Sequence, residues 1–258
     1  GFVLAGLFLG LGQYFYITMR AMPLVVALWL VSAFLVKRKQ FRLRLPGLLL
    51  AAYIALIAIL PLGLYFSRHT DQLYARSNHV SIFGEWMESQ TAMSGRSEVQ
   101  VFAGQMANAA LGLVSEPLRL LYEPGAPLLL AVAATLFVIG LLWAFYDFDL
   151  RYWLLLLPVL ATLIMVTLSR DAPSSQRYIM AVPFVVLFVA LPIGLLTEWL
   201  SNLWPHHKRL ASVPAAVLIA WIMVSETGYY FNSVYEQYLL GGNNTQVATE
   251  VAAYLQDG

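Results

Sequence analysis

The residues of this chain with the clearest chemical potential are two arginines that stand near prolines between apolar runs. Arg177 closes the stretch SRDAPSSQR (Ser169–Arg177), and Arg20 opens RAMPLVV, where Pro23 follows. A guanidinium group is planar, permanently charged and able to hold two phosphate oxygens at once. If the fold places Arg20 and Arg177 together, they can form a clamp for a phosphate-bearing ligand.

Helix N-termini would add to the same chemistry. Three segments, RAMPLVV, EPGAPLLL and RDAPSSQR, put a proline where an apolar run begins, and proline suits the first turn of a helix. Free N–H groups and the helix dipole at such an end attract anions. We expect Asp171 and Pro173 to start a helix that holds Arg177 about one turn inside, where a cation opposes the dipole.

An interfacial role is the alternative for both arginines. Arginines near helix ends often extend their charged heads toward lipid headgroups. Asp171 could also neutralise Arg170 or Arg177 locally. The residues alone leave the ligand site and the interfacial role open.

The elements that must position these arginines lie in a membrane. The chain has 258 residues, of which 60% are hydrophobic and 11% charged, and its mean hydropathy is +0.71. Soluble domains contain about 45–50% apolar and about 25% charged residues. The net charge of +1 gives no reason to expect a nucleic-acid partner, and the absence of cysteine excludes disulfides and thiolate chemistry.

Seven apolar runs approach the length of about 20 residues that crosses a bilayer as a helix. We therefore expect an all-α polytopic membrane protein with about seven transmembrane helices. Arg20 and Pro23 separate the first two runs, which we expect to form a tight hairpin. The runs are 2–17, 21–36, 46–66, 126–146, 152–168, 177–197 and 210–226.

The basic residues predict the orientation, because short loops rich in lysine and arginine stay in the cytoplasm. The loop 37–44, KRKQFRLR, holds five of the chain's fifteen basic residues. Alternation then places the long loop 67–125 and SRDAPSSQR outside, and YDFDLR and WPHHKRL inside. We expect a transmembrane domain over 1–227 and an extracytoplasmic segment over 228–258. Both ends of the sequence look cut, so we expect a fragment with a truncated C-terminal segment.

Other polar residues offer weaker chemistry. Glu85 and Glu88 are expected to be solvated, and the spacing of His69 and His79 fits no metal motif, so we expect neither metal nor cofactor. Gly6 and Gly10 form a GxxxG pattern in the first span, which predicts close helix packing. The stretch VQVFAGQMANAALGLV within the long loop has apolar residues at helical spacing and could lie flat on the interface.

Several stretches together resemble a family. They are GLFLGLGQYFYITMRAMPL, ILPLGLYFSRHTDQLYARSNHVSIF and LSRDAPSSQRYIMAVPFVV, with GYYFNSVYEQY after the last span. The pattern resembles the middle and C-terminal part of bacterial membrane glycosyltransferases with the GT-C fold, in the family-39-like group of protein O-mannosyltransferases and aminoarabinose transferases. It extends over roughly residues 1–240 and contains no catalytic motif.

The resemblance implies a reaction and a place for it. A hexosyl-type sugar would pass from a polyprenyl-phosphate carrier to a glycan, lipid or protein acceptor, outside the inner membrane of the cell envelope. The family's general base is an acidic residue in the first outer loop, which would precede Gly1, so we assign no catalytic residue. The resemblance places Arg20 and Arg177 near the lipid phosphate. Secondary contacts would be Arg76, His79, Asp171 and, as a ring contact, Tyr16.

Two other functions remain open. A transporter or flippase of an anionic lipid-linked substrate could use the same arginines, but it should show repeated halves and charges near mid-span. A polysaccharide polymerase or ligase subunit, or a scaffold, could use the long outer loop to bind partners. We find no convincing repeat, and the polar residues gather at the predicted outer edge, so we favour the transferase.

Overall fold

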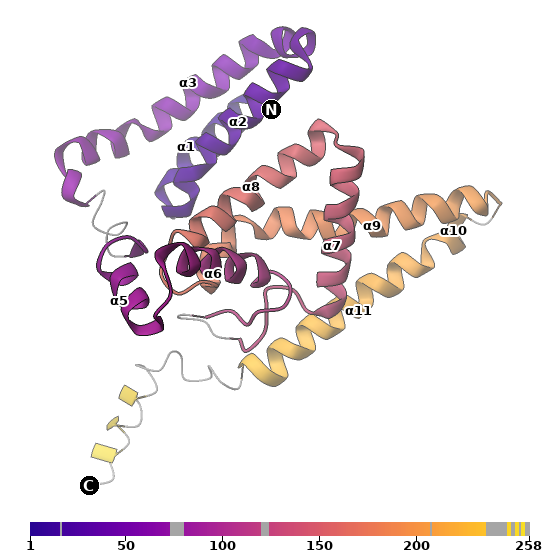
Figure 1. Cartoon of the computed structure of the whole chain (residues 1–258). Coiled ribbons are helices and arrows are strands. Elements are labelled where there is room, and N and C mark those ends of the chain that lie inside the picture. The colour runs from indigo at the N-terminus through magenta and orange to yellow at the C-terminus, as the bar shows by residue number, and fades with distance from the viewer. Residues whose placement is uncertain are drawn as a thin grey trace.

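The computed structural model describes residues 1–15, 17–72, 80–119, 124–206 and 208–235, and the tail positions 247–248, 251–252 and 254–255. Within these ranges every named element is a helix, so the all-α prediction is confirmed (Figure 1). The α-helices are α1 (Phe2–Leu11), α2 (Met22–Val36), α3 (Arg38–Arg68), α5 (Glu85–Ser94), α6 (Glu98–Leu111), α7 (Ala131–Asp147), α8 (Leu150–Thr167), α9 (Val182–Leu203), α10 (Lys208–Ala211) and α11 (Val213–Tyr229).

Five helical segments of the described chain are long and apolar enough to cross a membrane. They are Met19–Val36, Arg38–Arg68, Leu150–Thr167, Val182–Leu203 and Arg209–Val234. The two other predicted runs also contain apolar helices, α1 and α7, but these are shorter than a span requires. The chain is thus a helical protein with five candidate spans, and the count of seven stays a prediction.

The break between the first two runs consists of two 3-10 turns, η1 (Gly12–Tyr14) and η2 (Ile17–Ala21). Buried Gln13 crosses this break, because its Nε2 donates to the carbonyl oxygens of Leu9 at 3.0 Å and Met19 at 3.1 Å. Pro23 lies in the first turn of α2, as predicted. The chain therefore reverses direction through a stabilised turn.

Helix α1 packs chiefly along α3, and not along α2 as the hairpin prediction implied. The contact depends on small residues: a Cβ at Gly6 would lie 2.2 Å from the carbonyl oxygen of Ala51, and one at Gly10 would lie 2.8 Å from that of Ala55. The two helices run parallel, since the contacts advance along both in the same direction. The predicted close packing through GxxxG is confirmed.

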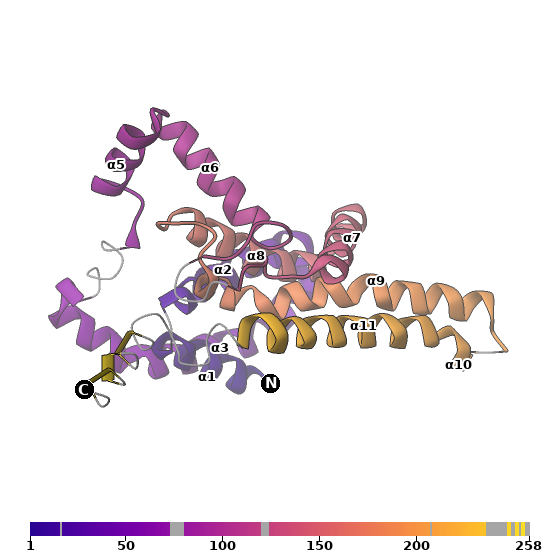
Figure 2. The ribbon, with the colours of Figure 1, turned by 90° about the horizontal axis from the view of Figure 1, so that it is seen from below.

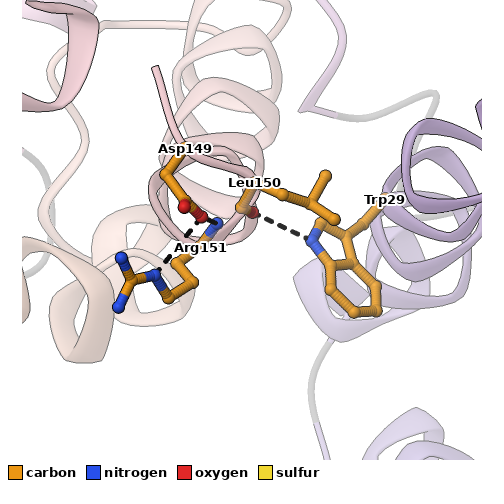
Figure 3. A network of polar contacts seen from close by, with 4 residues as sticks. All are labelled: Trp29, Asp149, Leu150 and Arg151. Atoms are coloured by element: carbon orange, nitrogen blue, oxygen red, sulfur yellow. Dashed lines mark hydrogen bonds and ion pairs between the residues drawn. The ribbon is translucent and has the colours of Figure 1, made fainter. Parts of the chain in front are cut away.

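Helix α2 instead packs against α8. The indole Nε1 of Trp29 donates to the carbonyl oxygen of Leu150 at 3.2 Å, as Figure 3 shows. One turn further along α2, the Ser32 hydroxyl accepts a hydrogen bond of 3.0 Å from Trp153 Nε1. These two bonds join the α1–α3 part of the molecule to the remaining helices.

The buried core lies among α6, α7, α8 and α9. Helix α7 crosses α9, where the rings of Phe137 and Phe188 meet edge to face at 6.0 Å (Figure 1). Helices α9 and α11 run side by side and are joined through α10 (Figure 2). Ala172, Tyr178 and Ala181 also belong to this core, so the segment between α8 and α9 is packed rather than solvated.

Much of the long predicted outer loop is helical. Helices α5 and α6 stand out from the bundle in Figure 2, and the far end of α6 returns to pack against α8. Ser97 and Gln100 form a capping box that starts α6. Gln105 and Ala109 are the buried residues of α6, and they face the segment that carries SRDAPSSQR.

Candidate functional site

Two short 3-10 turns bring the predicted arginines into one region. Arg20 lies in η2 and Arg177 in η3 (Ser175–Met180), and these turns pack against each other and against α8. The turns are separated by most of the chain length in sequence. Their contact is the tertiary arrangement that a shared ligand site would need.

Arg20 is exposed at the edge of this region. Its guanidinium carbon lies 4.8 Å from the centre of the Phe66 ring, near the end of α3. Such a cation–π contact at an exposed site is worth about 0.5–1 kcal/mol. It orients the side chain while the charge stays accessible to solvent or to a ligand.

Arg177 is half-buried and holds its own loop together. Its Nη1 donates to the Ser169 hydroxyl and to the carbonyl oxygen of Arg170 at 2.7 Å. Arg170 in turn donates from Nε to the carbonyl oxygen of Ser81 at 3.0 Å. Backbone bonds from Arg170 to Val80 and from Ile82 to Leu168 complete the connection to residues 80–82.

Helix α6 forms a platform beneath the loop. The Gln105 Oε1 accepts from the backbone N–H of Ala172 at 2.9 Å, and the Tyr178 hydroxyl donates to the carbonyl oxygen of Ala109 at 2.6 Å. A Cβ at Gly112 would lie 2.4 Å from Pro173 Cβ and 2.6 Å from the Tyr178 hydroxyl. Only glycine therefore permits this close approach of α6 to the loop.

A further arginine, Arg119, lies beside the same loop. Its N–H donates to the carbonyl oxygen of Pro173 at 2.8 Å, and its own carbonyl accepts from Ser175 N–H at 3.0 Å. The Arg119 side chain is exposed. The sequence analysis did not select it, because a single arginine in a long loop has no local pattern. Its backbone pairing with SRDAPSSQR is purely tertiary.

The predicted helix start at Asp171 and Pro173 is wrong. Helix α9 begins at Val182, with Pro183 in its first turn, and Arg177 lies in the preceding 3-10 turn. Arg177 is therefore outside the helix that it was expected to oppose. The backbone groups of the loop bond to Gln105 and Arg119, and these tertiary contacts override the local signal of Pro173.

The predicted start at EPGAPLLL is also displaced. Helix α7 begins at Ala131, after both prolines of that segment. The N–H of Leu130, the residue just before α7, donates to the Glu226 Oε1 at 3.2 Å, so a carboxylate from α11 contacts the start of α7. Of the three proline-led starts, the one at Pro23 matches the structure.

The other predicted site residues contribute less to the geometry. Asp171 is exposed, has a left-handed backbone with φ of 58°, and belongs to no ion pair among the described residues. Local neutralisation of the arginines by Asp171 therefore has no support in the described ranges. Tyr16, Arg76 and His79 lie outside the described residues. Glu85 and Glu88 are exposed, as expected for solvated carboxylates.

The phenol of Tyr178 is kept neutral by its surroundings. Burial raises the pKa of Tyr178 well above its ordinary range, because the phenolate would lose hydration. The hydroxyl thus remains a donor to Ala109 at neutral pH. The loop that carries Arg177 is held by a neutral, buried hydrogen bond that ordinary changes in pH leave intact.

The comparisons with known proteins add no relative. No family model, curated protein or solved structure matches this chain. The turn η2, with exposed Arg20, packs against η3, with half-buried Arg177, and exposed Arg119 pairs with the backbone that leads into η3. Such an arrangement can hold an anion at the edge of an apolar helical bundle.

Proposed function

We propose that this chain is part of a membrane glycosyltransferase that transfers a sugar from a polyprenyl-phosphate carrier to an acceptor on the extracytoplasmic face. The observation that supports the proposal is the contact between η2 and η3, which carry Arg20 and Arg177. The family resemblance assigns these same arginines to the lipid phosphate. The proposal places the carrier's phosphate at the segment Ser169–Arg177, which we call the arginine loop, and its prenyl tail along the neighbouring apolar helices.

The chemistry of the leaving group favours such a loop. When the sugar leaves, negative charge develops on the carrier phosphate, and fixed cations in a partly dry site stabilise it. A lipid carrier also needs an apolar path beside the cations. The candidate span Met19–Val36 begins within the turn that bears Arg20, and the candidate span Val182–Leu203 follows the turn that bears Arg177.

On this proposal the two arginines have different roles. Exposed Arg20 is the better placed of the two to meet an incoming phosphate. Half-buried Arg177 bonds to Ser169 and Arg170, so it also sets the shape of the loop. We assign no catalytic base among the described residues, and the sugar and acceptor are left as classes.

The test is sugar transfer by the product of the complete reading frame, reconstituted in liposomes with a polyprenyl-phosphate-linked radiolabelled sugar. Arg20→Ala should lower turnover by about a hundredfold if Arg20 contacts the leaving phosphate. Arg20→Lys should recover part of the loss, because it keeps the charge without the bidentate fork.

Arg96→Ala is the matched control. Arg96 is an exposed arginine in the connection between α5 and α6, away from the arginine loop. Equal losses of turnover in Arg20→Ala and Arg96→Ala would show that the effect comes from general surface charge. Carrier that crosses the bilayer with its sugar still attached would favour a flippase instead.

A further inference from the structure

A cavity of about 690 Å³ lies between α2, α3 and α8, at the ends of these helices farthest from the arginine loop. Most of its wall is apolar and includes Trp29, Leu48 and Leu155. The remaining wall consists of Gln40 and three cations, Lys37, Arg44 and Arg151. The cavity therefore combines an apolar interior with a basic rim.

One bond between helices and two local bonds at the start of α8 fix the part of the cavity near Leu150 and Arg151. Trp29 joins α2 to the first residue of α8 through the Leu150 carbonyl (Figure 3). Asp149 caps α8 by accepting from the Arg151 N–H at 2.8 Å and also pairs with Arg151 Nε at 3.3 Å. This carboxylate offsets part of the Arg151 charge, and the rim keeps an excess of positive charge through Lys37 and Arg44.

We propose that this cavity binds an anionic phospholipid, with its phosphate at Lys37 and Arg44 and an acyl chain against Trp29, Leu48 and Leu155. A small anion would have no use for the apolar wall, and a neutral lipid would leave the cations without a partner. Basic pockets between membrane helices are suited to lipid headgroups of this charge. The inference is independent of the glycosyltransferase proposal.

The chain supplies a matched control for the rim. Arg38 and Arg42 belong to the same basic segment, but they line a different, smaller depression at the surface. Replacing them removes as much charge as replacing Lys37 and Arg44. If the basic segment is only attracted to an anionic bilayer in general, both pairs of substitutions should weaken lipid binding equally. If the cavity is a specific site, only the substitutions at Lys37 and Arg44 should weaken it.

The experiment is native mass spectrometry of the protein released from nanodiscs that contain equal amounts of phosphatidylglycerol and phosphatidylcholine with identical acyl chains. The wild-type protein should retain phosphatidylglycerol in preference to phosphatidylcholine. Lys37→Gln with Arg44→Gln should lower that preference more than about tenfold, given about fivefold per lost charge. Arg38→Gln with Arg42→Gln should leave it nearly unchanged.

A second variant tests the apolar wall. Leu48→Trp should fill the cavity and reduce the amount of retained lipid of either kind, with helix content unchanged by circular dichroism. Equal effects of the two charge-removal pairs, or no effect of either, would overturn the proposal. Displacement of the lipid by inorganic phosphate, but not by chloride at the same ionic strength, would also overturn the proposal and would indicate a site for a soluble anion.

Discussion

The Nη1 atom of Arg177 lies 2.7 Å from the carbonyl oxygen of Arg170 and donates a hydrogen bond to it. This bond closes the SRDAPSSQR loop upon itself, and Arg170 then ties the loop to Ser81. The cation proposed to face a phosphate is thus also a structural member of the loop. Replacing Arg177 would therefore remove a positive charge and also the hydrogen bonds that hold the loop in its shape.

Arg177→Ala should therefore destabilise the protein more than Arg20→Ala. Removal of the Arg177 guanidinium leaves acceptors without a partner, and hydrogen bonds to charged groups contribute about 1.5–3 kcal/mol. Arg20 loses an exposed contact with Phe66 that is worth about 0.5–1 kcal/mol. Thermal unfolding of both variants in one detergent measures the difference, and equal midpoints would show that Arg177 does not support the loop.

Two glycine substitutions, one inside the α1–α3 contact and one outside it, should change the stability of the protein in opposite directions. Gly6→Ala should destabilise by about 1–3 kcal/mol, because its Cβ would lie 2.2 Å from the Ala51 carbonyl oxygen and the helices would have to separate. Gly63→Ala, with no neighbour within 4 Å, should gain up to about 1 kcal/mol from helix propensity. Unfolding midpoints of the two variants give the comparison. A stable Gly6→Ala protein would contradict the close packing.

Tyr178 should make stability fall at alkaline pH. Because burial raises the pKa of Tyr178, the folded state favours the neutral phenol. This contribution is fully present below the unfolded pKa of about 10 and is lost as pH rises above it, where the unfolded chain releases the proton more readily.

Tyr178→Phe is the variant that isolates this effect. It removes the titrating group and the hydrogen bond to Ala109, so its stability should be lower at neutral pH by about 1–3 kcal/mol and should fall less between pH 9 and pH 11. Unfolding curves of both proteins across that range supply the measurement. Parallel declines would assign the alkaline loss to other groups.

The predicted sidedness can be tested by labelling, since the chain contains no cysteine. Met93→Cys in α5 and Leu43→Cys in the basic segment would place single thiols at residues that are 82% and 76% exposed. The distribution of basic residues predicts Met93 outside and Leu43 inside. An impermeant maleimide should label Met93→Cys in intact cells, and Leu43→Cys only after lysis. The reverse pattern would invert the topology.

Local patterns predicted the helices well. Each of the seven apolar runs contains an apolar helix, and Gly6 and Gly10 pack as expected, because both features follow from the composition and spacing of one segment. Patterns were less successful at helix starts. Pro173 indicated a start that the structure does not contain, because Gln105 and Arg119 bond to the backbone there and hold it in a packed loop.

The sequence by itself determined a helical protein for an apolar environment, since hydrophobic runs and the scarcity of charge need no tertiary information. The tertiary structure alone decided that α1 pairs with α3, that η2 meets η3, and that Arg119 lies along the SRDAPSSQR loop. These contacts join residues far apart in the chain through buried hydrogen bonds and small-residue packing. Such interactions depend on the arrangement of whole helices, which no local spacing encodes.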